Sequence, residues 1–270
     1  MLNTYAQLKP LELSPELTPI LYNTRKHDKL TDRYETISTI DPINVLRDHG
    51  WQPRQLIKLN TRKESRKGLQ AHRVRLFNPE LPIVNGSFLE LLLTNAYDGS
   101  KAFQIQLGIF RMICSNGLVT GDNYSSESVK HIGYANEKIA SALHNVIPQA
   151  PKIANAIDQW STINLSPNEQ RALAHSTLEL RLGEDYNVED QRAVNGVLSA
   201  NRYEDRKDDL WTVYNRLQEN VIKKGFRAQK TDNSYRTKKV RAVNSMNKQD
   251  YLNKALWSLS ERMAEIKLAA

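Results

Sequence analysis

The stretch that decides the fold lies between Phe88 and Cys114 and reads FLELLLTNAYDGSKAFQIQLGIFRMIC. It holds two runs rich in β-forming residues, 88–96 and 102–114, separated by the turn-forming pair Asp98-Gly99. Apolar and polar residues alternate through most of the second run, as a strand with one buried face requires. This pattern predicts a long antiparallel hairpin.

Toward the N-terminus, the sequence predicts further strands and one short helix. Asp41-Pro42 supplies a helix start, and Gly50 ends that helix. Strands are predicted at 56–59 and at 72–76. In the second of these, Arg73 and Arg75 alternate with apolar residues, so we expect a half-buried strand whose two arginines share one face.

Toward the C-terminus, helical spacing replaces alternation. A stripe of apolar residues from Val129 to Val146 predicts a helix of about five turns, which Pro148 and Pro151 should end. Further helices are predicted after the capping sequence Ser166-Pro167-Asn168-Glu169, over 210–224 and over 252–263, with a solvated loop at 226–243.

Strands followed by helices indicate an α+β fold with an antiparallel sheet and long hairpin in the N-terminal half and a helical C-terminal half. We expect a mostly β, basic part at 1–120 and a mostly helical part at 121–270, within one compact unit. Residues 121–126 are the most plausible seam between the two.

The cysteine count and the distribution of apolar residues indicate the compartment in which the protein works. Among 270 residues there is one cysteine, Cys114, so no intramolecular disulfide can form and a reducing compartment is expected. The chain holds no uncharged apolar run of the length that a membrane span needs, and no signal-peptide pattern. These features predict a cytoplasmic protein without a membrane partner.

The net charge of +8 is segregated along the chain. Segments 54–75 and 223–241 each hold eight cations and one anion, whereas 121–210 is net acidic. Such blocks favour a polyanionic partner, and DNA is the one we predict. The predicted nucleic-acid-binding residues are Arg62, Lys63, Arg66, Lys67, Arg73, Arg75, Arg236, Lys238, Lys239 and Arg241.

Aromatic residues near the first basic block predict a preference for single strands. Phe77, Tyr97 and Phe103 lie on or beside predicted strands, where their rings could stack on unpaired bases. The alternative is that the basic block only protects a solvated sheet edge against aggregation.

Catalytic and metal-binding motifs are absent from the sequence. It contains no phosphate-binding glycine loop, no dinucleotide fingerprint and no His-Glu-x-x-His, and its six histidines are scattered. Cys114 is interpreted as a small buried residue, and Asp185, Glu189 and Asp190 as solvated charge. We therefore predict no catalytic residue, metal or cofactor. Arg111, inside an apolar run, must find either an internal ion pair or a ligand.

The block 107–119 resembles the Gly-x-x-Arg-x-x-Cys-Ser/Thr-Asn-Gly signature of a phage- and plasmid-like family, domain of unknown function 932. Its matching residues, read as a structural motif, are Arg111, Cys114, Asn116 and Gly117. Segments 214–220, 238–241 and 252–257 resemble later blocks of the same family, although Lys223-Lys224-Gly225 stands where a glycine pair is expected. The resemblance implies a mobile-element setting in a bacterial cell.

These observations favour a noncatalytic protein that binds single-stranded DNA in replication, recombination or strand annealing. A homo-oligomer is an open alternative, because annealing proteins commonly form rings. A second hypothesis is an anti-defence or host-takeover protein that binds replication or defence proteins through its basic blocks. A third is a nuclease or nucleotide-processing enzyme, which would need carboxylates to hold a divalent metal.

Overall fold

The computed structural model describes residues 9–111, 117–119, 126–131, 135–185, 187, 190–229 and 237–269. The chain folds as two compact units, one of Met1–Gly117 with Tyr124–Lys152 and the other of Leu118–Asn123 with Ile153–Ala270. The predicted α+β class is confirmed, with a sheet in the N-terminal half and helices in the C-terminal half. The boundary between the units differs from the one expected at residues 120–121.

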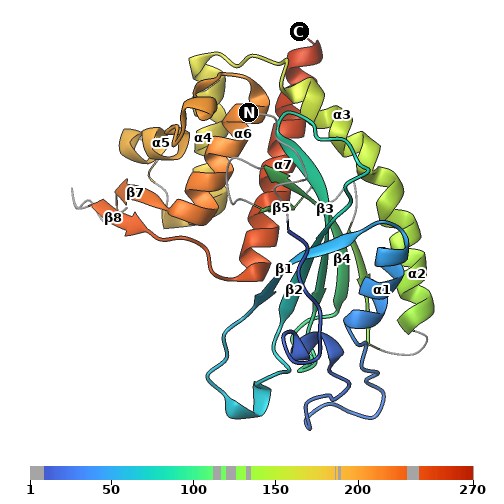
Figure 1. Ribbon diagram of the computed structural model, residues 1–270. Coiled ribbons are helices and arrows are strands. Elements are labelled where there is room, and N and C mark those ends of the chain that lie inside the picture. The colour runs from blue at the N-terminus through green and yellow to red at the C-terminus, as the bar shows by residue number, and fades with distance from the viewer. Residues whose placement is uncertain are drawn as a thin grey trace. The chain divides into compact units, whose positions relative to one another are not determined.

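An antiparallel sheet forms the centre of the first unit (Figure 1). Its strands run in the order β1 (Gln52–Lys58), β2 (His72–Phe77), β3 (Ser87–Asn95) and β4 (Phe103–Arg111), and β6 (Ser126–Val129) pairs with β4. The predicted hairpin is confirmed, because β3 and β4 pair from Ser87 opposite Arg111 to Thr94 opposite Gln104. A short strand, β5 (Gly117–Val119), follows β4 in sequence.

Cross-strand partners project to the same face, so the pairing divides the sheet into an apolar and a polar face. The apolar face carries buried residues of three strands, namely Val74, Leu76, Leu89, Leu91, Leu93, Phe103, Ile105, Leu107 and Ile109. The other face, which we call the polar sheet face, carries Arg73, Arg75, Glu90, Thr94, Gln104 and Gln106 from the same strands, together with Phe77, Phe88, Leu92 and Phe110. Placing charged groups on a buried face requires that they be paired.

Helix α2 (Ala135–Val146) packs on two strands of the sheet, β4 and β6. In this helix, Ile139, Leu143 and Val146 form a buried stripe. The predicted start of this helix at Val129 is wrong, because Val129 pairs with Phe103 as the last residue of β6. Pairing with β4 therefore determines the conformation of Val129, although its spacing from the next apolar residues is helical.

The predicted end of this helix at the two prolines is confirmed, because α2 ends at Val146. A 3₁₀ turn, η4 (Ile147–Gln149), and a separate helix, α3 (Ala150–Trp160), follow; the spacing of Ile153, Ile157 and Trp160 also predicts this shorter helix. Pro148 and Pro151 lie in the first turns of these elements, where a proline loses no intrahelical hydrogen bond.

A buried hydrogen-bond network fixes the start of α1 (Ile40–Asp48) to the sheet. The hydroxyl of Thr39 lies 2.8 Å from His72 Nε2 and 2.8 Å from Tyr97 Oη, and it accepts from Asn95 Nδ2 at 3.0 Å. Burial, together with the nearby charge of Lys58, lowers the pKa of His72 from 6.5 to about 4. The imidazole is therefore neutral in the folded protein at physiological pH.

The second unit is mainly helical. It contains α4 (Pro167–Leu182), α5 (Gln191–Leu198), α6 (Leu210–Gln218), the π-helix η7 (Glu219–Lys224) and α7 (Met246–Ala269), with the short 3₁₀ turns η5 (Gly183–Asp185) and η6 (Tyr203–Arg206). The predicted capping box is confirmed at α4, where Ser166 N donates to Glu169 Oε2 at 2.7 Å and Glu169 N donates to Ser166 Oγ at 3.4 Å.

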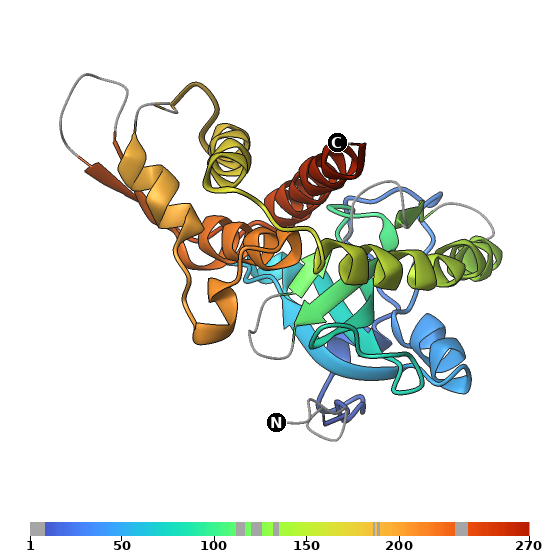
Figure 2. The ribbon, with the colours of Figure 1, turned by 90° about the horizontal axis from the view of Figure 1, so that it is seen from above.

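The loop predicted at 226–243 is instead partly a β-hairpin, which we call the β7–β8 hairpin. Its strands are β7 (Phe226–Gln229) and β8 (Thr237–Val240), and Phe226 pairs with Val240. Both Figure 1 and Figure 2 show β7 beside α5, and these two elements are in contact. Phe226 and Ala228 are buried, so packing stabilises a segment whose sequence looks like a solvated loop.

Within the described ranges, no helix is long and apolar enough to span a bilayer.

Candidate nucleic-acid interface

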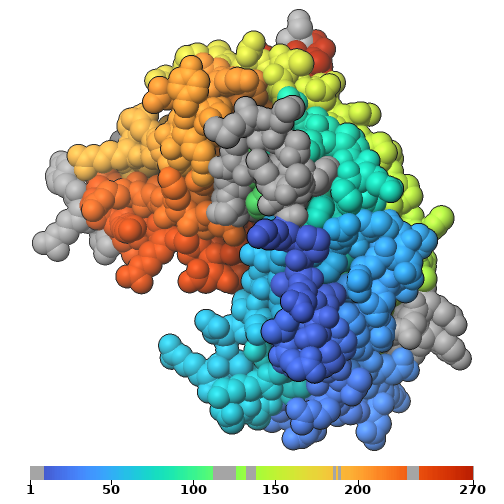
Figure 3. Space-filling view, in the orientation of Figure 1, coloured from blue at the N-terminus to red at the C-terminus, as the bar shows by residue number. Residues whose placement is uncertain are grey.

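The connection between β1 and β2, residues 59–71, forms a basic arm with an exposed tip. It contains the 3₁₀ turn η3 (Glu64–Arg66), and residues 62–68 are all exposed. In Figure 3 its cyan atoms stand at the outline of the first unit. Backbone hydrogen bonds from Leu59 N to Ala71 O and from Tyr97 N to Leu69 O, both 2.9 Å, fix its two ends. The arm is thus a defined loop that displays its tip to solvent.

The charges at the tip of the basic arm are incompletely neutralised. Lys67 pairs with Glu64 at 2.6 Å, and Arg66 lies 3.8 Å from Asp98. Arg62 and Lys63 form no ion pair within the described part of the chain. The Lys67–Glu64 pair is exposed on both sides and contributes little free energy, roughly 0–1 kcal/mol, so a polyanion can replace Glu64. The Asp98 side chain, in contrast, is 4% exposed, so Arg66 lies beside a buried carboxylate. Arg62, Lys63 and Lys67 are therefore the least constrained cations of the arm.

The predicted roles of Arg73 and Arg75 require correction. All six residues of β2 are buried, whereas the alternating sequence predicts a half-buried strand. The two arginines do share one face, but β2 lies between β1 and β3, and both its faces are covered. Arg73 Nε donates to Thr94 Oγ1 at 2.8 Å. Neither guanidinium forms part of the exposed basic surface.

Arg75 instead belongs to a buried ion cluster on the polar sheet face. The Glu90 side chain is 0% exposed; one of its oxygens accepts from Arg54 Nε and the other from Arg75 Nε at 2.7 Å. The ring of Phe110 lies against both cations, with its centroid 3.9 Å from Arg54 Cζ and 5.1 Å from Arg75 Cζ. Burial lowers the pKa of Arg75, and the charge of Glu90 opposes this effect.

The Arg54–Glu90–Arg75 cluster was missed in the sequence, although it has a signal there. Glu90 interrupts an otherwise apolar run, Leu89 to Leu93. A carboxylate at such a position must be paired, and nearby arginines are suitable partners. The cluster joins side chains of three strands, with Arg54 on β1, Arg75 on β2 and Glu90 on β3.

The predicted stacking role of three aromatic rings is wrong. Phe77, Tyr97 and Phe103 are all buried, and Tyr97 hydrogen-bonds to Thr39 inside the first unit. Rings that are part of the core cannot stack on the bases of a bound strand. The basic arm therefore offers charge without base-stacking side chains from this set.

A second basic surface lies on the β7–β8 hairpin. Arg227 pairs with Lys239 across the two strands, and both side chains are exposed, as are Lys238 and Arg241. No ion pair joins these four cations to a carboxylate in the residues that the structure describes. Of the predicted binding residues, Arg236 lies outside the described residues.

One buried carboxylate fixes the base of the β7–β8 hairpin to α5. Asp190 Oδ1 accepts from Arg192 N at 3.1 Å and from Ala193 N at 3.2 Å, which caps the helix. The second oxygen of Asp190 accepts from Gln229 N at the end of β7. The interpretation of this residue as solvated charge is therefore wrong.

The residues of the signature motif lie near the end of β4. Arg111 is buried and pairs with Ser87 of β3, and Gly117 begins β5. Cys114 and Asn116 lie outside the described residues. In the described ranges, no group of three or more His, Cys, Asp or Glu residues could hold a metal ion.

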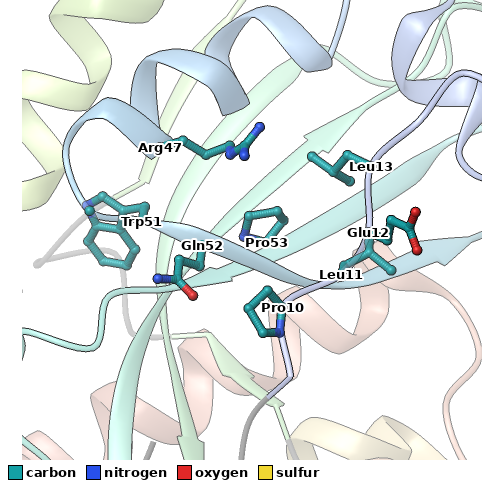
Figure 4. Close-up of a pocket in the computed structure, with 9 residues that line it drawn as sticks. Pro10, Leu11, Glu12, Leu13, Arg47, Trp51, Gln52 and Pro53 are labelled. Carbon is teal, nitrogen blue, oxygen red and sulfur yellow. The ribbon is translucent and has the colours of Figure 1, made fainter. Parts of the chain in front are cut away.

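A pocket of about 540 Å³ lies in the first unit, between the segment at residues 10–13, the end of α1 and the start of β1 (Figure 4). Its lining consists of Pro10, Leu11, Glu12, Leu13, Arg47, Gly50, Trp51, Gln52 and Pro53. Leu11 N donates to Pro53 O at 2.6 Å, so the segment covers the edge strand of the sheet. None of the lining residues belongs to the basic arm or to the β7–β8 hairpin.

Comparison with known proteins identifies the family. The model described as "Domain of unknown function (DUF932)" matches residues 26–257. The UPF0380 protein YafZ of Escherichia coli strain K12 is 31% identical over 249 residues, which cover 92% of this chain and 88% of that protein. The UPF0380 protein YfjQ of the same strain is 31% identical over 247 residues, with the same two shares. No solved structure matches. The predicted resemblance is confirmed, and the chain belongs to the DUF932 family.

Proposed function

We propose that this chain is a noncatalytic nucleic-acid-binding protein that contacts phosphates through the basic arm and the β7–β8 hairpin. The observation that carries the proposal is the exposed tip of the arm, which holds four cations, Arg62, Lys63, Arg66 and Lys67, and one anion, Glu64; Asp98 lies 3.8 Å from Arg66. The mobile-element setting implied by the family resemblance makes single-stranded DNA in replication, recombination or annealing the proposed target.

The physical basis of the proposal is the release of counterions from the nucleic acid. Each phosphate neutralised by a lysine or arginine releases condensed cations, so affinity falls steeply as salt rises. Side chains on an exposed loop reach phosphates without displacing core residues. Because the basic arm lacks the predicted stacking rings, its contacts should depend little on base sequence.

The test is equilibrium binding to labelled single-stranded and duplex DNA across a salt series, with the variant Arg62→Glu/Lys63→Glu. We expect affinity to fall at least tenfold and the salt slope to become shallower by about 1.4, which is roughly 0.7 for each lost phosphate contact on a single strand. The DNA should remain full-length with magnesium present.

The matched control is Arg25→Glu/Lys29→Glu, which changes the charge equally at two exposed positions of the same unit. If both variants lose affinity to the same extent, only net charge matters and the basic arm is no interface. Weak binding by the unmodified protein that does not respond to salt would reject the proposal outright and favour an acidic protein partner.

A further inference from the structure

The β7–β8 hairpin is a two-stranded ribbon with one face packed on a helix. In the described part of the chain, β7 and β8 pair with each other and with no other strand. Phe226 and Ala228 share one face and are buried. A Cβ added at Gly196 of α5 would lie 3.4 Å from Phe226 Cβ, so this face is in close contact with the helix. Figure 1 shows the hairpin at the left margin of the second unit, beside α5.

The opposite face of the ribbon carries polar side chains. Cross-strand pairing places Arg227 beside Lys239 and Gln229 beside Thr237. Arg227 and Lys239 are exposed, and Gln229 and Thr237 are half-buried. Arg227 Nη1 donates to Thr237 Oγ1 at 3.3 Å. We call these four residues the ribbon face. It combines two cations with an amide and a hydroxyl, and it contains no acidic side chain.

Hydrogen bonds to the helices fix both strands of the ribbon. Gln229 N, at the end of β7, donates to Asp190 at the start of α5. Arg181 Nη2 of α4 donates to the carbonyl of Arg241, the residue after β8, at 3.0 Å. A surface held in place before it meets a partner loses less conformational entropy on binding. The ribbon face is therefore a preorganised surface.

The dimensions of the ribbon match the major groove of duplex DNA. Its two strands lie about 4.8 Å apart, the spacing of paired strands. The major groove of B-form DNA is about 12 Å wide and admits a two-stranded β-ribbon, whereas the minor groove is only about 6 Å wide. Double-stranded RNA has a deep, narrow major groove that side chains cannot read. The shape therefore selects duplex DNA.

The side chains of the ribbon face are those that distinguish base pairs in the major groove. An arginine such as Arg227 donates two hydrogen bonds to guanine O6 and N7, and a glutamine such as Gln229 pairs with adenine N6 and N7. Lys239 can also donate to guanine, and Thr237 offers a hydroxyl to any base and a methyl group to thymine. The face thus carries groups for both kinds of base pair.

We propose that the ribbon face reads base edges in the major groove of duplex DNA. This inference rests on the proposed function, because it takes DNA as the partner, and it adds sequence recognition to the phosphate contacts. Arg227 and Gln229 carry the discrimination between base pairs. Lys238 pairs with Ala228 and so lies off the ribbon face, and its exposed ammonium contacts a phosphate at the edge of the groove.

The experiment begins with selection of tightly bound sequences by the full chain from a library of random DNA duplexes. Affinity is then measured for the enriched duplex and for a scrambled duplex of the same length and composition, which carries the same phosphate charge. The enriched duplex should bind at least tenfold more tightly, within the discrimination of roughly 1–3 kcal/mol that one bidentate contact provides. The same sequences as single strands, or as duplex RNA, should show no such ratio.

The decisive variant is Gln229→Ala, which removes the amide without changing the charge or the backbone donor to Asp190. The ratio of the two affinities should fall about fivefold, and affinity for the scrambled duplex should stay unchanged. Because the readout is a ratio, it does not depend on the folded fraction of each preparation. Gln159→Ala, at an exposed glutamine of the same unit, is the matched control and should keep the ratio.

A contrasting variant separates phosphate contacts from base contacts. Lys238→Gln should weaken binding to both duplexes equally and make the salt slope shallower by about 0.9, the value for one phosphate contact on duplex DNA. The Arg62→Glu/Lys63→Glu variant of the basic arm should likewise weaken binding to both duplexes and leave their ratio unchanged.

The outcomes distinguish the two proposals. Binding without any enriched sequence, or the same ratio in Gln229→Ala as in Gln159→Ala, would overturn base reading and leave the phosphate interface standing. An equal preference for the enriched sequence as a single strand would also overturn it, because a single strand has no groove. Absence of binding to any DNA would reject both proposals.

Discussion

Replacing Glu90 with glutamine tests the role of the buried ion cluster. The amide keeps the volume of the side chain but removes the only anion of the Arg54–Glu90–Arg75 set, in which both oxygens accept from guanidinium groups. Two cations then remain beside Phe110 with no compensating charge. Breaking a buried pair in this way destabilises proteins by about 3–5 kcal/mol, and we expect a loss in that range.

The structure also predicts which substitution in the cluster destabilises the protein more. With Glu90 present, the set carries one surplus positive charge, so Arg54→Met leaves a neutral Arg75–Glu90 pair and should destabilise less than Glu90→Gln. Urea unfolding followed by circular dichroism measures both, with Glu80→Gln at an exposed site as the control. A loss for Glu90→Gln below about 1 kcal/mol, or the reverse order, would refute the assignment of a paired buried charge.

Two further predictions concern pH and backbone conformation. Because the pKa of His72 falls from 6.5 to about 4 on folding, the unfolded chain takes up a proton at higher pH than the folded chain does. The free energy of unfolding should therefore drop by about 3 kcal/mol as pH falls from about 6.5 to 4. Urea titrations should show a weaker dependence of this free energy on pH in His72→Gln, and an unchanged dependence would contradict the prediction. At Gly225, with φ +78°, an added Cβ would lie 2.1 Å from Val240 O, whereas Gly183, with φ +60°, has no atom within 4 Å. Gly225→Ala should therefore lower the melting temperature well beyond Gly183→Ala, which carries only the conformational penalty of about 1–3 kcal/mol. Equal melting temperatures would show that the backbone moves away.

Features set by neighbouring residues could be predicted from the sequence. The β3–β4 hairpin follows from alternation on both sides of Asp98-Gly99, and the start of α4 follows from Ser166 and Glu169. The basic arm is recognisable because its charge density is a property of the sequence alone. These signals act over a few residues, so no knowledge of packing is needed.

Features set by distant contacts could not be predicted. Val129 has the spacing of a helix residue but pairs with Phe103, which lies 26 positions earlier. The β7–β8 hairpin depends on α5, and the burial of Arg73 and Arg75 depends on both faces of β2 being covered.

The bulge in β1 gives the sheet a tolerance for changes in chain length. Pro53 pairs with Leu76 and Gln55 with Arg75, so Arg54 has no partner of its own on β2. If one residue is deleted from β1, the bulge can close into regular pairing. The residues that precede the bulge then still point to the same face of the sheet. In alignments of relatives, a single-residue gap in β1 therefore signals a change in the ion cluster and not a new fold.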